Sequence, residues 1–174
     1  MSQNALAHLR AIRRELESRV RESGTIVILM GASGQGLRQR RRLRGVLSRR
    51  GLLALVPEDD FPRDIAPSLV ERAMLSEGDV DLAFINLESW GTATEFGQFH
   101  EIRRIARKLR ILVDHQYHPL HSNSRSYLTD LYLTHLAVYG HVYPVARARR
   151  SLLPSVKKTV TKLAVRYSQW KALH

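Results

Sequence analysis

The stretch that decides the fold is Thr25-Ile26-Val27-Ile28-Leu29-Met30, followed at once by Gly31-Ala32-Ser33-Gly34-Gln35-Gly36. The first six residues are apolar or β-branched without interruption, which is typical of a strand buried on both faces. The glycine-rich turn ends that strand, and the basic stretch after it, to about residue 50, predicts a helix. A strand, a tight turn and a helix in this order predict the first half of a βαβ unit.

Outward from this unit, strand and helix patterns alternate along the whole chain. Four more apolar runs predict strands, at residues 52–56, 80–87, 110–113 and 141–145. Helices are predicted at about residues 5–21, 67–76, 127–139 and 154–172, and one more helix carries Phe96 to Leu109. This alternation predicts a single α/β domain over residues 1–174. Its fold is expected to be flavodoxin-like (Rossmann-like), a five-stranded parallel sheet in the order 2-1-3-4-5 with helices on both faces.

Composition narrows the class of protein. The chain has 174 residues, 44% of them apolar, which suits one domain with a hydrophobic core. The lack of cysteine excludes disulfides, thiolate metal sites and cysteine nucleophiles. The formal charge of +12 attracts polyanions, so phosphorylated small molecules, RNA and DNA all stay open as partners. No apolar run approaches the roughly 20 residues needed to cross a bilayer and no signal peptide is visible, so we expect a cytoplasmic protein without membrane contact.

The turn that follows the first strand has the two glycines of a phosphate-binding P-loop at the right separation. A P-loop requires Lys and then Ser or Thr after the second glycine. This chain has Leu37 and Arg38 there, which argues against a nucleoside triphosphatase. Glycine backbone and the free amides at a helix start still favour an anion, and a tight turn without a ligand is the alternative. The candidate substrate contacts here are Gly31, Ala32, Ser33, Gly34, Gln35 and Arg38.

The third predicted strand leads into Gly91-Thr92-Ala93-Thr94-Glu95, where we expect a turn and then a helix. In open parallel sheets ligands bind beyond the carboxyl ends of the strands. Strands one and three are neighbours in the predicted order, so the turns at Gly31 and Gly91 should line one crevice. Glu95 is therefore the first candidate for chemistry, with Gly91 and Thr92 as substrate contacts. The alternative is a capping box, in which Thr92 and Glu95 satisfy free amides at the helix start.

Residues 77–87 and 91–97 together resemble nucleoside 2-deoxyribosyltransferases and related nucleotide N-glycosidases. The resemblance is strongest over about residues 79–114, where an apolar third strand is followed by a Gly-Thr-x-x-Glu-x-Gly turn into a helix. It implies a flavodoxin-like fold, a glutamate at Glu95 that attacks the anomeric carbon, and cleavage or exchange of a base. The wider group includes TIR-like NAD-cleaving domains and SLOG nucleotide-binding domains, and it divides into enzymes and sensors.

The same chemistry can be argued from the residues. Breaking an N-glycosidic bond develops oxocarbenium character, which a nearby carboxylate stabilises or traps covalently. Glu95, in the first helical turn, is expected to stay ionised because the helix dipole favours an anion there. Where the deoxyribosyltransferases often have Asp near the end of the third strand, this chain has Asn86 and Glu88. We expect substrate contacts from Asn86, while Asp59, Asp60 or Glu88 would orient sugar hydroxyls or protonate the base.

Three further groups carry weaker signals. His115, His118 and His121 recur at every third residue, a spacing that can suit zinc, but Pro119 and polar neighbours favour an exposed loop or a lid, and we predict no metal site. The arginine-rich stretch at residues 38–50 and the basic C-terminal helix would suit nucleic-acid phosphates, with a solvated helix face as the default. On the last helix, Tyr167 and Trp170 are expected to pack against the sheet or another subunit.

Two functions of different class stay open. The first is an enzyme that cleaves or transfers the N-glycosidic bond of a nucleoside, nucleotide or NAD-like substrate without a cofactor. The second is a binding module, either a non-catalytic nucleotide sensor or a basic nucleic-acid-associated protein. The first and last helices would also suit self-association as a homo-oligomer.

Overall fold

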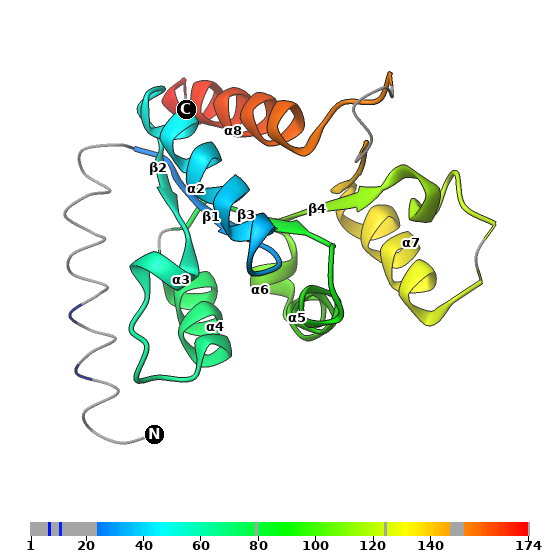
Figure 1. The fold of residues 1–174 in the computed structure, drawn as a ribbon, viewed down its shortest axis with the longest axis horizontal. Coiled ribbons are helices and arrows are strands. Elements are labelled where there is room, and N and C mark those ends of the chain that lie inside the picture. The colour runs from blue at the N-terminus through cyan, green and yellow to red at the C-terminus, as the bar shows by residue number, and fades with distance from the viewer. Residues whose placement is uncertain are drawn as a thin grey trace.

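A five-stranded parallel sheet forms the middle layer of the molecule (Figure 1). The computed structural model describes residues 24–78, 80–123, 125–146 and 152–173, together with Ala7 and Ala11. The predicted order 2-1-3-4-5 is confirmed, and each neighbouring pair of strands is parallel. The strands are β1 (Ile26–Met30), β2 (Leu53–Leu55), β3 (Leu82–Asn86), β4 (Leu109–Asp114) and β5 (Val142–Val145).

Helices cover both faces of the sheet, as a flavodoxin-like fold requires. On one face lie α2 (Gln35–Ser48) and α8 (Val156–Ala172), which run across the upper part of Figure 1. On the other face lie α4 (Pro67–Glu77), α5 (Trp90–His100), α6 (Arg103–Ala106) and α7 (Tyr127–Tyr139). The predicted helix at residues 5–21 lies outside the described residues, except for Ala7 and Ala11.

The core is divided by the sheet into two clusters, because successive strand side chains point to opposite faces. In β1, Ile26 and Ile28 pack toward α4 to α7, whereas Val27 and Leu29 pack toward α2 and α8. All five residues of β1 are buried, and so are all five of β3. Burial on both faces explains why these strands read as continuous apolar runs rather than as alternating patterns.

The amino end of the sheet is fastened to the last helix. Asp81, just before β3, accepts a hydrogen bond from the backbone N–H of Ile26 at 2.8 Å and pairs with Lys171 Nζ at 2.9 Å. The Tyr167 hydroxyl donates to the same carboxylate at 3.3 Å. Tyr167 thus packs against the sheet as expected, while the side chain of Trp170 is mostly exposed.

Two local predictions are wrong. Residues 96–109 do not form one helix, because Ile102 has an extended backbone between α5 and α6, and Leu109 already belongs to β4. Residues 58–60 lie in a short helix, α3 (Pro57–Asp60), rather than in a loop. Pro57 starts that helix, where its missing N–H costs nothing. The Asp60 carboxylate accepts from the Val56 N–H at 2.7 Å and holds the helix start in place.

Candidate functional site

The carboxyl ends of β1 and β3 lie side by side, because Met30 pairs with Ile85 in the sheet register. The chain continues from β1 into the Gly31 turn and from β3 into Glu88. A Cβ atom at Gly31 would lie only 3.7 Å from Cβ of Asn86, so the two segments are in close contact. This edge is where sheets of this class bind their ligands.

A cleft of about 660 Å³ opens from this edge and extends between α2 and α8. Its polar end is formed by Gly31, Gln35, Gly36, Asn86 and Glu88. Its remaining walls are largely apolar and come from the sheet and both helices, with Leu29, Leu43, Val46, Phe84, Leu112, Val156 and Val160. Arg42 and Lys157 add positive charge to the lining.

The start of α2 points its free amides at the polar end of the cleft. Gly34 caps the helix with a φ of 62°, a left-handed conformation that favours glycine, and it offers no side-chain oxygen to the amides. Gln35 and Gly36, the first two helical residues, line the cleft. Ala32, Ser33 and Arg38 belong to the same segment but do not line the cleft.

Asn86 and Glu88 form a polar pair on the opposite side of that end. The Asn86 amide donates to Oε1 of Glu88 at 2.6 Å, and Oε2 of Glu88 would lie 3.1 Å from a Cβ at Gly36. Asn86 is only 8% exposed, and its Oδ1 has no hydrogen-bond partner within the described residues. A buried acceptor of this kind costs free energy unless a donor reaches it.

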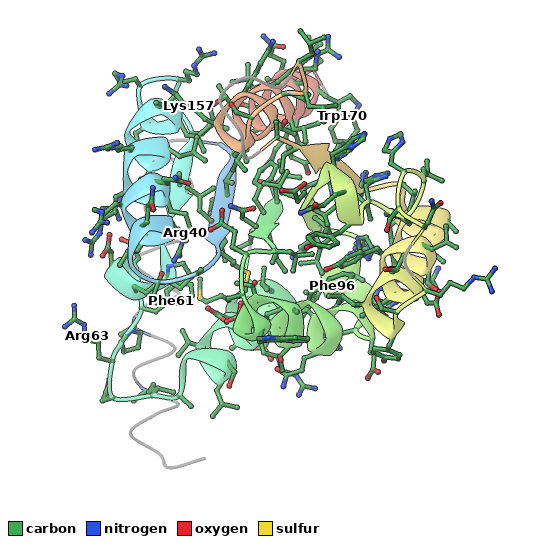
Figure 2. The ribbon with its side chains drawn as sticks, turned by 45° about the vertical axis from the view of Figure 1, so that its right-hand side comes forward. Arg40, Phe61, Arg63, Phe96, Lys157 and Trp170 are labelled. Carbon is green, nitrogen blue, oxygen red and sulfur yellow. The ribbon has the colours of Figure 1, made fainter. Side chains whose placement is uncertain are left out.

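Arg40, which we had expected on a solvated helix face, is buried at 7% exposure. Its guanidinium donates to the carbonyl oxygens of Leu29, Gly31 and Ala32 at 2.9 to 3.2 Å. It also binds both carboxylate oxygens of Glu58, at 2.6 and 2.7 Å. Figure 2 shows Arg40 on α2 near the α3 segment. The residue therefore fastens the turn after β1 to the helix after β2 and places a positive charge beneath the site.

Asp59 and Asp60 pair with two further arginines of α2. Arg41 binds Asp59 at 2.6 Å, and Arg44 contacts Asp59 and Asp60 at 3.1 Å. The hydrogen bond from Arg41 lowers the pKa of Asp59 from its ordinary value. Both carboxylates are thus already paired, and their predicted role in orienting a sugar stays a prediction.

Two carboxyls with raised pKa values, Glu95 on α5 and Glu71 on α4, lie on the other face of the sheet from the cleft. Burial raises the pKa of Glu95, and the negative charge of Glu58 raises it further. Glu71, on α4, is 5% exposed, and burial together with Glu95 and Glu58 raises its pKa to about 8. Arg40 opposes both shifts, since its positive charge favours the ionised carboxylates.

Glu71 was not among the residues predicted from the sequence. It shares its helix face with Met74 and Leu75, three and four positions on, and both are buried. A carboxyl on the apolar face of an amphipathic helix is unusual, and this position could have indicated that Glu71 is buried. The partners that shift its pKa come from α5, α3 and α2, so only the tertiary structure reveals them.

The capping-box alternative for Glu95 is wrong. Helix α5 begins at Trp90, one residue before the expected turn, and its capping box joins Ser89 and Thr92. The Ser89 hydroxyl accepts from the Thr92 N–H at 3.3 Å, and the Thr92 hydroxyl accepts from the Ser89 N–H at 3.2 Å. Thr92 is therefore buried in the cap, while Gly91 lies exposed in the first turn of the helix.

Glu95 therefore lies past the first turn of α5, where the helix dipole acts weakly. Burial raises the pKa of Glu95 from its ordinary value, so the helix dipole does not dominate the charge of this carboxyl as expected. Glu95, Gly91 and Thr92 do not line the cleft between α2 and α8. The sheet edge brings Gly31, Gln35, Asn86 and Glu88 together in the cleft and leaves Glu95 on the α5 side.

The three histidines of the loop after β4 lie close together. The rings of His115 and His121 stack with centroids 4.4 Å apart, and those of His118 and His121 are 5.1 Å apart. His118 is buried and its Nε2 lies 3.3 Å from the Val142 carbonyl. In the described part of the chain no group of three or more His, Asp or Glu side chains has the arrangement needed to hold a metal ion.

None of the helices within the described ranges is both long and apolar enough to cross a membrane. Comparison of the sequence with models of known protein families yields no match, and comparison with curated proteins yields none either. The resemblance to N-glycosidases thus stays a prediction drawn from the residues themselves.

Proposed function

We propose that the protein cleaves or exchanges the N-glycosidic bond of a nucleoside, nucleotide or NAD-like molecule, with Glu95 as the attacking group. The observation that supports this proposal best is the pair of perturbed carboxyls, Glu95 and Glu71, above the buried cation Arg40. Perturbed titratable groups cluster at functional sites. This pair also lies at the sheet edge that binds ligands in folds of this class.

For this attack Glu95 must be ionised, while Glu71 holds a proton. Glu71, with a pKa of about 8, is mostly protonated and adds little negative charge beside Glu95. Arg40 favours the ionised form of Glu95, and partial burial removes part of the water that would otherwise stabilise that carboxylate. A carboxylate in this setting suits attack on an electron-poor carbon.

In the proposed reaction, a carboxylate oxygen of Glu95 bonds to the anomeric carbon while the bond from that carbon to the base nitrogen breaks. The electron pair of the broken bond leaves with the base, which takes a proton from Glu88. Water then attacks the anomeric carbon, releases Glu95 and returns a proton to Glu88. A second base in place of the water would give exchange instead of hydrolysis.

The first experiment compares wild type with Glu95→Gln on a panel of nucleosides, nucleotides and NAD, with released base followed by chromatography. We expect release by wild type and a loss of several orders of magnitude in the variant, up to about 10⁶-fold as for other removed nucleophiles. Glu101→Gln is the matched control, because Glu101 is an exposed glutamate at the end of the same helix. Wild-type rates in Glu95→Gln would overturn the role of Glu95.

The same experiment separates the enzyme from a sensor. If wild type releases no base, a rise in its melting temperature with one of the same compounds would favour a nucleotide-binding module. For the nucleic-acid alternative, Arg40, Arg41 and Arg44 already pair with carboxylates of α3. That pairing leaves less free positive charge on α2 than the sequence indicates, so we favour the small-molecule ligand.

A further inference from the structure

We propose that the amino edge of the sheet, opposite the candidate site, binds a single-stranded polynucleotide. The surface consists of Arg107 and Arg110 at the start of β4, and of Arg166 and Trp170 near the end of α8. We call these four side chains the amino-edge surface. Binding there would go beyond the proposed function, because Glu95 and the cleft belong to the carboxyl edge of the sheet.

The arginines of the amino-edge surface are not neutralised in the way that several arginines of α2 are. Arg40, Arg41 and Arg44 all pair with carboxylates of α3. Arg107, in contrast, is exposed and forms no ion pair with any residue that the structure describes. In a chain with a formal charge of +12, unpaired guanidinium groups of this kind attract the phosphates of a polyanion.

Arg110 adds a half-buried charge that no described carboxylate neutralises. Its Nη1 donates to the backbone carbonyl oxygens of Arg107 and Leu109, both at 3.0 Å, and this holds the guanidinium at the start of β4. Burial lowers the pKa of Arg110, and the nearby Tyr143 and Tyr167 oppose that shift. A guanidinium that is fixed in place and has further N–H donors suits the oxygens of a phosphate group.

The last turns of α8 lie across the amino edge of the sheet. Asp81, just before β3, accepts a hydrogen bond from the Tyr167 hydroxyl at 3.3 Å and pairs with Lys171 Nζ at 2.9 Å. The neighbouring strand β4 begins at Leu109, which is the register partner of Ala83 in β3. The end of α8 and the arginines at the start of β4 therefore belong to one surface. The Asp81 carboxylate at this edge is already neutralised by Lys171.

Trp170 gives this surface an aromatic ring on which a base can stack. Its side chain is 55% exposed, and its ring centroid lies 5.6 Å from that of Tyr167. Arg166 is also exposed and lies one turn earlier on the same side of α8. Basic side chains beside an aromatic ring bind single strands, because the phosphates meet the charges and the unpaired bases stack on the ring. The bases of a duplex are stacked on one another, so a duplex would not use Trp170.

The test measures fluorescence anisotropy of labelled oligouridylate, oligothymidylate and a DNA duplex, each about 12 nucleotides or base pairs long, with the full chain. We expect both single strands to bind at least tenfold more tightly than the duplex. The logarithm of the binding constant should fall with the logarithm of the salt concentration with a slope of about −2, since each of three arginines contributes about 0.7.

Arg107→Gln combined with Arg110→Gln should weaken single-strand binding at least tenfold and reduce the slope to about −0.7. Trp170→Leu should weaken binding at least fivefold and leave the slope unchanged, because it removes stacking and no charge. The matched control combines Arg63→Gln with Arg125→Gln, at two exposed positions of which Figure 2 shows the first far from Trp170. This control has the same net charge as the arginine pair variant and should bind within about twofold of wild type.

A single Arg107→Gln variant, at an exposed position, guards against misfolding of the double variant and should lose about one third of the slope. Equal losses in the double variant and its control would reduce the binding to net charge and overturn the surface. Duplex binding as tight as single-strand binding, or no effect of Trp170→Leu, would overturn the single-strand assignment. Tighter binding of one of the two single strands would support the surface and identify the ligand as RNA or DNA.

The same variants separate this surface from the proposed function. None of the four residues lies at the carboxyl edge, so any release of base should proceed at the wild-type rate in all variants. A protein that releases no base but binds single strands through these residues would refute the proposed function and support the surface. Release of base without binding of any oligonucleotide at about 50 mM salt would do the reverse.

Discussion

Glu71 links the candidate site to the stability of the protein, because it is a carboxyl that is buried among other carboxyls. Burial and the charges of Glu95 and Glu58 all disfavour its ionised form, and only Arg40 among the causes that shift its pKa acts in the other direction. The folded protein therefore holds a proton on Glu71 up to a pH of about 8. In the unfolded chain the same carboxyl would lose that proton near its ordinary pKa of 4.5.

The folded state thus binds more protons than the unfolded state between about pH 4.5 and pH 8, so Glu71 makes stability fall as the pH rises through that window. Glu71→Gln keeps the size of the side chain and removes its charge, so we expect its stability to fall less with rising pH. Between pH 4.5 and pH 8.5 its free energy of unfolding should improve relative to that of wild type by up to about 4 kcal/mol. Urea unfolding at a series of pH values measures the effect. Glu77→Gln, on an exposed position of the same helix, is the control. Parallel pH profiles of wild type and Glu71→Gln would contradict the assignment.

At the scale of elements, the site is held together by contacts between segments that are distant in sequence. Arg40 joins α2, the carboxyl end of β1 and α3 through its three carbonyl acceptors and Glu58. Arg41 and Arg44 add pairs to Asp59 and Asp60 nearer the surface. The buried contact is the one that matters most for stability, because exposed ion pairs contribute about 0–1 kcal/mol.

Arg40→Met would remove five hydrogen bonds at once and leave three backbone carbonyl groups short of donors. We expect a loss of about 2–4 kcal/mol in the free energy of unfolding, and a weaker preference for ionised Glu95. Arg38→Met, at an exposed position two residues earlier on α2, should change stability by less than about 0.5 kcal/mol. Denaturant unfolding of both variants checks the difference, and equal stabilities would show that the buried contact is unimportant.

At the scale of the whole molecule, two histidines with lowered pKa values determine how the stability changes in acid. His135, which is fully buried on α7, and His141, before β5, both have a pKa lowered to about 4, mainly by burial. His135 Nδ1 lies 3.1 Å from His100 Nδ1, and the charge of a protonated His100 would lower its pKa further. These side chains stay neutral in the folded protein at a pH where they would be protonated in the unfolded chain.

The unfolded chain therefore binds more protons than the folded one between about pH 6.5 and pH 4, so stability should fall as the pH drops through that range. Each of the two histidines accounts for up to about 3 kcal/mol of the loss. We expect the melting temperature of His135→Phe to fall less between pH 7 and pH 4.5 than that of wild type. His115→Gln, in the loop after β4, is the matched control. A wild-type melting temperature that is unchanged from pH 7 to pH 4 would contradict this prediction.

The order of the elements was predictable because each strand corresponds to an apolar run in the sequence. β1 and β3 are buried on both faces and so read as unbroken apolar runs, and Gly140, with a φ of 70°, ends α7 where a glycine after the apolar pattern predicted a stop. No residue pattern in the sequence indicated the break between α5 and α6. It depends on Ile105 and Ala106 packing against the rest of the core, which is a tertiary contact.

By itself the sequence determined a parallel five-stranded sheet and the segments that meet at its carboxyl edge, because hydrophobic periodicity and turn residues act over a few neighbours in the chain. The tertiary structure alone decided which polar residues are buried there. Arg40 stands in a run of arginines that looks solvated, and Glu71 is a carboxyl on an apolar helix face. Both are buried where α2, α3, α4 and α5 converge. Burial and charge at a site depend on distances across the fold. A pKa near 8 at Glu71 therefore cannot be predicted from the residues next to it in the sequence.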